Sequence, residues 1–243
     1  MNVPAIEIKN LVVNYGLLRA VRDVSFKTSQ GEVLAVVGAN GAGKTTLFRT
    51  ICGVHSSVSG SIRLYNTDVT TLAPYKRVAA GIAMVPEGRR LFTDMTVREN
   101  LIIAGENGRR GSWTLDTVTQ ALPVLESILT ASAGSLSGGQ QQAVAIGRAL
   151  MCNPKVLLLD EVSLGLSPVA VKGLYESLRN LKKIGRTTMI LVEQDLDRAM
   201  SFADRILCMH EGTIVLEGLP GVIDKKAVTN AYFGLDPKES AHA

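Results

Sequence analysis

The stretch VLAVVGANGAGKTT, residues 33–46, constrains the fold more than any other part of the sequence. Its apolar first half has the composition of a central parallel strand that is covered on both faces. The strand leads into the pattern G-x-x-x-x-G-K-[ST] and then into KTTLFRTIC, which has helical character. Glycines let such a turn wrap closely around phosphate oxygens, with successive backbone N–H groups pointing inward as donors. The three elements together predict a phosphate-binding loop.

The residues of this loop have separate expected roles. Lys44 would bridge the β- and γ-phosphates of a nucleotide, and the Thr45 hydroxyl would ligate Mg²⁺. A dinucleotide fingerprint would need a third glycine where Thr46 stands, so that alternative fails. A glycine turn of purely structural use remains as the other alternative. The expected nucleotide contacts are Gly38, Asn40, Gly41, Ala42, Gly43, Lys44, Thr45 and Thr46.

Apolar runs like the one before the loop recur along the chain. They are IAMVPE at 82–87, VLLLDE at 156–161 and MILVEQ at 189–194. Between the last two, SPVAVKGLYESLRNLKKIG has the features of a helix, with Ser167 as N-cap, Pro168 at its first position and Gly185 as its stop. Strands that alternate with helices indicate an α/β fold with a mainly parallel sheet.

Other segments depart from this alternation. AIEIKNLVVNY at 5–15 has two-residue apolar spacing, which predicts half-buried antiparallel strands near the N-terminus. From about 88 to 135 strand signals are missing, while VRENLIIAG and LDTVTQALPVLESIL have helical periodicity, so we interpret this part as a helical insertion. HEGTIVLEG predicts a hairpin, and we expect the polar end GLDPKESAHA to be mobile.

Two acids, Asp160 and Glu161, end the apolar run VLLLD. The carboxyl end of a buried parallel strand lies at the edge where α/β sheets bind ligands. Asp160 is suited to hold Mg²⁺ through water, and Glu161 to polarise an attacking water molecule. The alternative is that both acids only cap the following loop. The nearby phosphate loop motif favours the catalytic interpretation.

A second helix start that suits an anion lies in SLSGGQQQAVAIGRAL, residues 135–150. Ser137 makes a good N-cap, and Gly138 and Gly139 keep side-chain bulk away from the first exposed amides. A polyphosphate in the first loop would be enclosed on one side only, and a second helix start could close over it. The spacing leaves open whether residues 137–140 act in their own chain or in another.

With LSGGQ at 136–140 between the phosphate loop and LLLDE, the chain resembles ABC-type ATPases over nearly its whole length. The resemblance implies one cassette, residues 1–243, with ATP and Mg²⁺ as cofactors. Its P-loop core and antiparallel β subdomain would cover about 1–87 and 152–243, and a helical subdomain before the signature would cover about 88–151. In that family two cassettes pack head to tail, and each ATP is clasped by the phosphate loop of one and the signature helix of the other.

The resemblance also assigns individual residues. It places Ser137, Gly138, Gly139 and Gln140 against the nucleotide of a partner cassette. It makes Tyr15 the aromatic residue that stacks on adenine, although the two-residue spacing of Tyr15 from Val13 fits a sheet core equally well.

Several positions differ from the commonest pattern of the family. Glu87 stands where a glutamine near Mg²⁺ and the transport partner is usual, and Gln194 stands in place of a histidine. Ser167 replaces an aspartate and Val162 a proline. A glutamine amide can donate a hydrogen bond to the γ-phosphate but cannot act as an acid or base near neutral pH. We therefore hypothesise that this site is slow and that a partner cassette retaining histidine provides most of the turnover.

Taken together, P-E-G-R-R, D-E-V-S-L-G-L-S-P and V-E-Q resemble the ATP-binding subunits of bacterial branched-chain amino acid importers. This implies a second, non-identical ATPase subunit, two membrane permease subunits and a periplasmic binding protein, with the chain peripheral on the cytoplasmic face of the inner membrane. The alternatives are a related transporter of amides, urea or other cargo, a homodimer, and a soluble ABC ATPase of DNA repair or translation. That last class usually carries a long coiled-coil insertion or two cassettes, and neither is visible in the sequence.

Composition limits the remaining possibilities. Hydrophobic residues make up 46% and charged residues 20%, as in ordinary globular proteins. The net charge of +4 is scattered and aromatic residues make up only 5%, so we expect no nucleic acid partner. No apolar run approaches the roughly 18 residues of a membrane span, and the N-terminus lacks a secretory pattern. Cys52, Cys152 and Cys208 are widely spaced, which predicts reduced, buried thiols.

Overall fold

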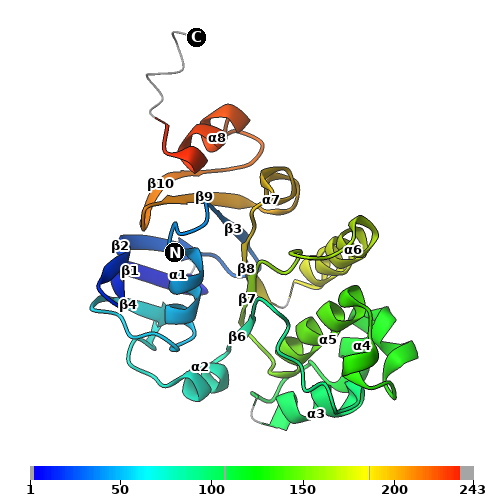
Figure 1. Ribbon diagram of the computed structural model, residues 1–243. Helices are drawn as coiled ribbons and strands as arrows, with labels where there is room; N and C mark the ends of the chain where they lie inside the picture. The colour runs from blue at the N-terminus through cyan, green and yellow to red at the C-terminus, as the bar shows by residue number, and fades with distance from the viewer. Residues whose placement is uncertain (1–2, 107, 186, 236–243) are drawn as a thin grey trace. The chain divides into compact units, whose positions relative to one another are not determined.

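The computed structural model describes residues 3–106, 108–185 and 187–235. The chain divides into two compact units. The first consists of Met1–Ala73 and Thr188–Ala243, and the second of Pro74–Thr187. Figure 1 colours the chain by residue number, so both units can be followed along the colour bar. The α/β class is confirmed, because parallel strands, antiparallel strands and helices are all present. The segment expected to be mobile, GLDPKESAHA, lies outside the described residues from position 236 onward.

The first unit contains the antiparallel sheet expected near the N-terminus. Its strands run in the order β2-β1-β4-β5. Ile6 of β1 pairs with Thr28 of β2 on one side and with Leu64 of β4 on the other. The alternating residues Ile6 and Ile8 are buried, as the two-residue spacing predicts. The strand bounds are β1 Ile6–Tyr15, β2 Leu18–Thr28, β4 Ser59–Leu64 and β5 Thr67–Asp68.

The same unit contains three parallel strands and one antiparallel edge strand, in the order β10-β9-β3-β8. Every residue of β3 and β8 is buried, which explains why both read as continuous apolar runs. The hairpin expected in HEGTIVLEG is confirmed, and its turn residues Glu211 and Gly212 both have positive φ. The strand bounds are β3 Val33–Val37, β8 Thr188–Val192, β9 Arg205–His210 and β10 Thr213–Gly218.

Three helices accompany these strands. Asp195 caps α7 by accepting a hydrogen bond from the Arg198 amide, and Asp224 caps α8 in a similar way. Helix α1 begins directly after the phosphate loop and has no side-chain cap, because its N-cap residue is Gly43. The helix bounds are α1 Lys44–Ile51, α7 Leu196–Phe202 and α8 Lys225–Phe233.

The second unit combines two parallel strands with a group of helices (Figure 1). Ser167 caps α6 and Gly185 ends it in the left-handed conformation, as the sequence predicts. Its elements are α2 Pro74–Ala80, β6 Ile82–Val85, α3 Val97–Glu106, α4 Leu115–Ala121, the 3₁₀ segments Pro123–Ile128 and Ala133–Ser135, α5 Gly138–Met151, β7 Val156–Asp160 and α6 Pro168–Ile184. The helical part expected at about 88–151 lies inside this unit.

The helices α3, α4 and α5 pack closely around a glycine. A Cβ atom at Gly147 of α5 would lie 2.8 Å from Leu101 and 3.1 Å from Leu125, so a larger residue would overpack this core. The helical pattern LDTVTQALPVLESIL does not form one helix, because α4 ends at Ala121 and a 3₁₀ segment begins at Pro123. Proline lacks the amide proton that would continue the α-helix.

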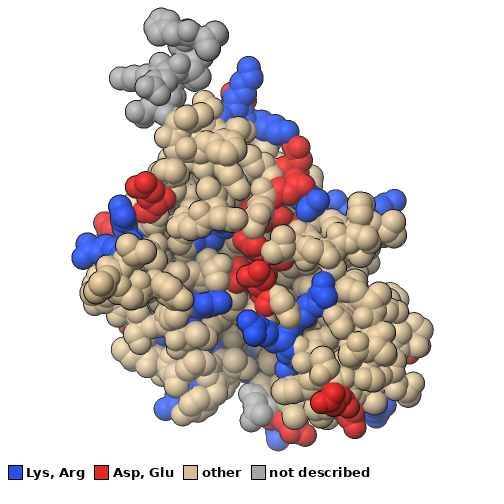
Figure 2. Space-filling model, in the orientation of Figure 1, with Lys and Arg blue, Asp and Glu red and all other residues tan. Residues whose placement is uncertain are grey.

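Charged side chains of both signs are spread over the face shown in Figure 2, so no single-sign patch covers that face. Among residues 3–106, 108–185 and 187–235, no helix is long and apolar enough to cross a membrane. The three cysteines are free thiols; Cys208 is buried, whereas Cys52 and Cys152 are only partly buried. The expectation of buried thiols therefore holds fully for Cys208 alone.

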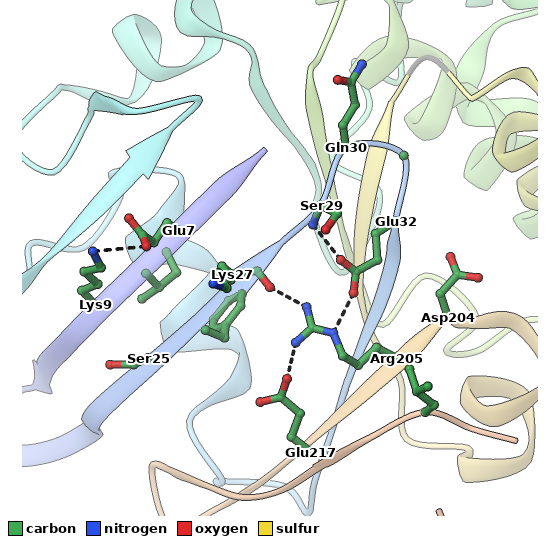
Figure 3. A pocket seen from close by; sticks show the side chains of 14 residues that line it. Glu7, Lys9, Ser25, Lys27, Ser29, Gln30, Glu32, Asp204, Arg205 and Glu217 are labelled. Carbon is green, nitrogen blue, oxygen red and sulfur yellow. Dashed lines mark hydrogen bonds and ion pairs between the residues drawn. The ribbon is translucent and has the colours of Figure 1, made fainter. Parts of the chain in front are cut away.

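Arg205 at the start of β9 links several segments of the first unit (Figure 3). Its guanidinium donates to the Glu32 carboxylate at 2.7 Å, and also to the Glu217 carboxylate and the Lys27 carbonyl. The side chain is only 17% exposed, and it lies at an open hollow of about 880 Å³. The planar Arg205 guanidinium thus donates hydrogen bonds to acceptors on three separate segments of the chain.

We predict that Arg205→Met lowers the free energy of unfolding of the chain by about 2–4 kcal/mol. Methionine keeps the aliphatic stem but leaves the Glu32 carboxylate, 15% exposed, without its charged partner. Urea denaturation measures the change. The control is Arg179→Ala on the exposed face of α6, for which we expect a change within about 0.5 kcal/mol. Equal effects of the two substitutions would contradict the structural role of Arg205.

Candidate nucleotide-binding site

The phosphate loop is held in shape by two close backbone approaches. A Cβ atom at Gly38 would lie 2.2 Å from the Met209 carbonyl oxygen, and one at Gly43 would lie 2.2 Å from the Ala20 carbonyl oxygen. Both glycines also have positive φ, 149° and 98°. Glycine at these positions is therefore required by steric contact as well as by conformation. The motif fixes where β9 and β2 lie against the loop.

Lys44 occupies the mouth of the loop. It is 4% exposed, and its Nζ donates to the Gly38 carbonyl at 2.6 Å and to the Ala39 carbonyl at 2.9 Å. An ammonium group has three donors and no acceptor, so it can turn toward a phosphate oxygen while staying close to these carbonyls. Hydrogen bonds to the loop backbone thus hold the Lys44 side chain in place for phosphate binding. Asn40 and Gly41 are exposed, Ala42 is buried, and Thr45 and Thr46 are partly exposed.

A buried thiol lies near the lysine. Burial raises the pKa of the Cys208 thiol to about 11, and the Lys44 ammonium lowers it by a smaller amount. Cys208 therefore stays a neutral thiol at physiological pH and behaves as a small apolar residue under the loop.

Tyr15 lies at the tip of the β1–β2 hairpin, in the same unit as the phosphate loop. Its side chain is 56% exposed, so placement in the sheet core is wrong. The pairing of β1 with β2 shifts between Val13 and Asn14, which breaks the two-residue alternation before Tyr15 is reached. The exposed ring is available to a planar base.

Gln194 follows β8 in the first unit and is partly exposed. Its backbone amide donates to the Glu193 carboxylate at 3.0 Å, and the Asp195 amide donates to the same carboxylate at 3.3 Å. Glu193 itself is 2% exposed. The buried Glu193 carboxylate therefore fixes the turn after β8, directly beside Gln194.

The two acids after β7 belong to the second unit. Asp160 is the last residue of the strand and is 2% exposed, while Glu161 is partly exposed with a φ of 48°. Glu161 lines a cavity of about 240 Å³ together with Glu87, Arg89 and Gln142. The structure thus brings Glu87 and Glu161, far apart in the sequence, to one cavity.

The second helix start forms as predicted. Ser137 Oγ accepts a hydrogen bond from the Gln140 amide, and Gln140 Oε1 accepts one from the Ser137 amide. Packing inside the chain also favours glycine at positions 138 and 139. A Cβ atom at Gly138 would lie 3.1 Å from the Arg89 guanidinium, and one at Gly139 would lie 2.9 Å from Ala170 Cβ.

Sequence reasoning missed two arginines that attach the loop after β6 to α5. Arg89 donates to Gln141 Oε1 at 2.9 Å. Arg148 donates to the Arg90 carbonyl at 2.6 Å and lies 4.7 Å from the centre of the Phe92 ring. The segment that carries Glu87 is therefore joined to the helix that begins at Ser137. Arg89 enters the sequence analysis only as part of the P-E-G-R-R motif, and Arg148 looks like an ordinary surface charge, so no sequence signal indicated either contact.

The donors expected for a metal fit Mg²⁺ in their chemistry. The Thr45 hydroxyl and the Asp160 and Glu87 carboxylates are hard oxygen ligands. Within the part of the chain that the structure describes, no group of three His, Cys, Asp or Glu side chains forms a protein-only metal site. Mg²⁺ commonly uses one or two protein ligands and completes its shell with water and substrate phosphates.

A glycine-rich turn between a parallel strand and a helix, with a preorganised lysine at its mouth, defines a P-loop nucleotide-binding protein. Residues 21–163 match the ABC transporter family, and the chain belongs to that family. It is accordingly an ABC-type ATPase.

Similar proteins cover nearly the whole chain. The high-affinity branched-chain amino acid transport ATP-binding protein BraG of Pseudomonas aeruginosa is 40% identical over 223 residues, 90% of this chain and 95% of BraG. The probable branched-chain amino acid transport ATP-binding protein LivF of Archaeoglobus fulgidus is 33% identical, covering 86% and 89% of the two chains. An ABC transporter cassette solved in its ADP conformation is 28% identical with a TM-score of 0.81, covering 98% of this chain and 97% of that one.

We predict opposite effects of alanine at two helical glycines of the second unit. Gly139→Ala should destabilise the chain by about 1–3 kcal/mol, because its Cβ would lie 2.9 Å from Ala170. Gly173→Ala on α6 meets nothing within 4 Å and should stabilise by about 0.5–1 kcal/mol through helix propensity. Urea denaturation compares the two. Stabilisation by both would show that the close contact at Gly139 is absent.

Proposed function

We propose that the chain is the ATP-binding and ATP-hydrolysing subunit of an importer of branched-chain, hydrophobic amino acids. The observation that carries the proposal is the 40% identity to BraG over 223 residues. The phosphate loop, the acids after β7 and the Ser137 helix start supply the chemistry that such a subunit needs. The other ATP-binding proteins named for the same transport extend this support.

The nucleotide would be held mainly by the first unit. The amides from Gly38 to Thr46 and the Lys44 ammonium would bind the phosphates, and the exposed Tyr15 ring would stack on adenine. The hairpin that carries Tyr15 and the loop that carries Lys44 already contact each other through the close approach of Ala20 to Gly43. The residues proposed for the phosphates and for the base therefore belong to the same compact unit.

Hydrolysis would depend on the acids of the second unit. Bound Mg²⁺ neutralises phosphate charge, and Thr45, Asp160 and Glu87 are the residues that would hold it, directly or through water. Glu161 would accept a proton from the attacking water as general base. Gln194 can donate a hydrogen bond to a γ-phosphate oxygen, but its amide takes no part in proton transfer.

The helix start at Ser137, Gly138, Gly139 and Gln140 would close over the ATP held by a second, non-identical cassette. Ser137 is exposed, and its helix α5 has 14 residues, enough for a helix dipole that favours a nearby phosphate. ATP shared between two cassettes stabilises the closed pair by mass action, and hydrolysis removes that stabilisation. This gives a cycle that can move an attached permease.

The helical subdomain at about 88–151, with Glu87 at its entry, would dock on two membrane permease subunits from the cytoplasmic face of the membrane. A periplasmic binding protein would act through the permease without touching this chain. The arginine contacts between the Glu87 loop and α5 support this arrangement, because they would pass a movement of that loop to the Ser137 helix start.

We predict that Glu161→Gln abolishes transport while ATP binding persists. The complete transporter, reconstituted in vesicles with its binding protein, should take up radiolabelled leucine with ATP, and the variant should lose uptake by at least about 10²-fold because the general base is missing. The purified variant, mixed with its partner cassette and ATP, should form stable dimers, which light scattering measures. Uptake of urea in place of leucine would contradict the cargo. Hydrolysis at the parent rate would contradict the role of Glu161.

We predict that Gln194→His raises the ATPase rate of the purified chain by about 10-fold or more, because an imidazole can exchange protons near neutral pH. A coupled phosphate-release assay at saturating ATP measures the rate. The parent chain should be slow alone and faster with a partner cassette. Fast unaided hydrolysis that the substitution leaves unchanged would contradict the hypothesis.

A further inference from the structure

His55 contacts Tyr15, the residue assigned to adenine. The two ring centres are 5.6 Å apart and the ring planes meet at 86°, an edge-to-face arrangement. Such aromatic pairs contribute beyond the area they bury, because the positive edge of one ring faces the negative face of the other. The contact therefore restricts the orientation of a ring that is otherwise 56% exposed.

The position of His55 is itself fixed by helix α1. The His55 and Val54 amides both donate to the Arg49 carbonyl in the last turn of α1, and the Val58 amide donates to the Val12 carbonyl of β1. The short segment after α1 is thus tied to the helix at one end and to β1 at the other. The helix that begins with Lys44 therefore supports, beyond its C-terminus, the strand that ends at Tyr15.

No polar contact of the imidazole with the described residues explains why a histidine stands at position 55. Its Nε2 atom is buried and has no hydrogen-bond partner among the described residues. A buried polar atom without a partner costs free energy, so a phenylalanine would fill the same place with less penalty. The feature of His55 that matters for Tyr15 is therefore the ring.

We propose that His55 is a positioning residue for nucleotide binding, which holds the Tyr15 ring in the orientation that accepts the base of ATP. The inference rests on the proposed role of Tyr15. A ring held in place before binding loses less side-chain entropy when the base stacks on it. His55 should thus affect the affinity for the base and leave the affinity for the phosphates unchanged.

The test compares two ligands by titration calorimetry on the purified full chain with Mg²⁺: ATP, and tripolyphosphate, which lacks the base. His55→Ala should weaken ATP binding by about 2- to 10-fold, the range that an aromatic pair is worth. Its affinity for tripolyphosphate should stay within about 2-fold of the parent. His55→Phe keeps a ring at this position and should bind ATP within about 2-fold of the parent.

Two results would overturn the inference: unchanged ATP affinity in His55→Ala, or an equal loss for ATP and tripolyphosphate, which would indicate a general effect on the fold. If His55→Ala does not fold, His55→Leu replaces it, because leucine fills the space without an aromatic ring. Its expected loss of ATP affinity is the same, and wild-type affinity in His55→Leu would also overturn the inference.

Tyr15→Ala separates this inference from the proposed function. Loss of base stacking should weaken ATP binding by about 5- to 100-fold without affecting tripolyphosphate. Unchanged ATP affinity in Tyr15→Ala would contradict the assigned role of Tyr15 itself. A loss in Tyr15→Ala together with none in His55→Ala would contradict only the role of His55. Tyr75→Ala, at an exposed tyrosine of α2, is the control and should change neither affinity.

Discussion

The close approach of two carbonyl oxygens to the phosphate loop is the constraint on which the first unit depends. The Met209 oxygen occupies the space of a Cβ at Gly38, and the Ala20 oxygen occupies that at Gly43. β9 and β2 can therefore lie against the loop only because both positions are glycine. The contact at Gly43 also brings the β1–β2 hairpin, which carries Tyr15 at its tip, against the phosphate loop.

Glycines at the Ser137 helix start likewise allow close contacts, here with side chains instead of backbone carbonyls. These glycines leave amides open to an anion, but Gly138 also makes room for the Arg89 guanidinium and Gly139 for Ala170. The motif thus serves packing inside the second unit as well as the proposed contact with a partner nucleotide. A substitution there would affect both, so stability and association must be measured separately.

Much of the fold was predictable because its determinants are local. Continuous apolar runs marked β3, β7 and β8, and capping residues marked the start of α5 and both ends of α6. The prediction failed where a single residue or a register shift overrides periodicity. Pro123 divides a helical pattern, and the shift after Val13 removes Tyr15 from the core. Short elements such as β5 and α7 carry too few residues to show a period.

The sequence by itself determined the phosphate loop, the acids after β7, the capped helix at Ser137 and membership of the ABC transporter family. These features depend on residue type at fixed spacing along the chain. Only the tertiary structure decided that Arg205 joins three segments, that Arg89 and Arg148 attach the Glu87 loop to α5, and that His55 contacts Tyr15. These contacts join residues far apart in the chain through side chains that have no characteristic spacing, so folding alone brings them together.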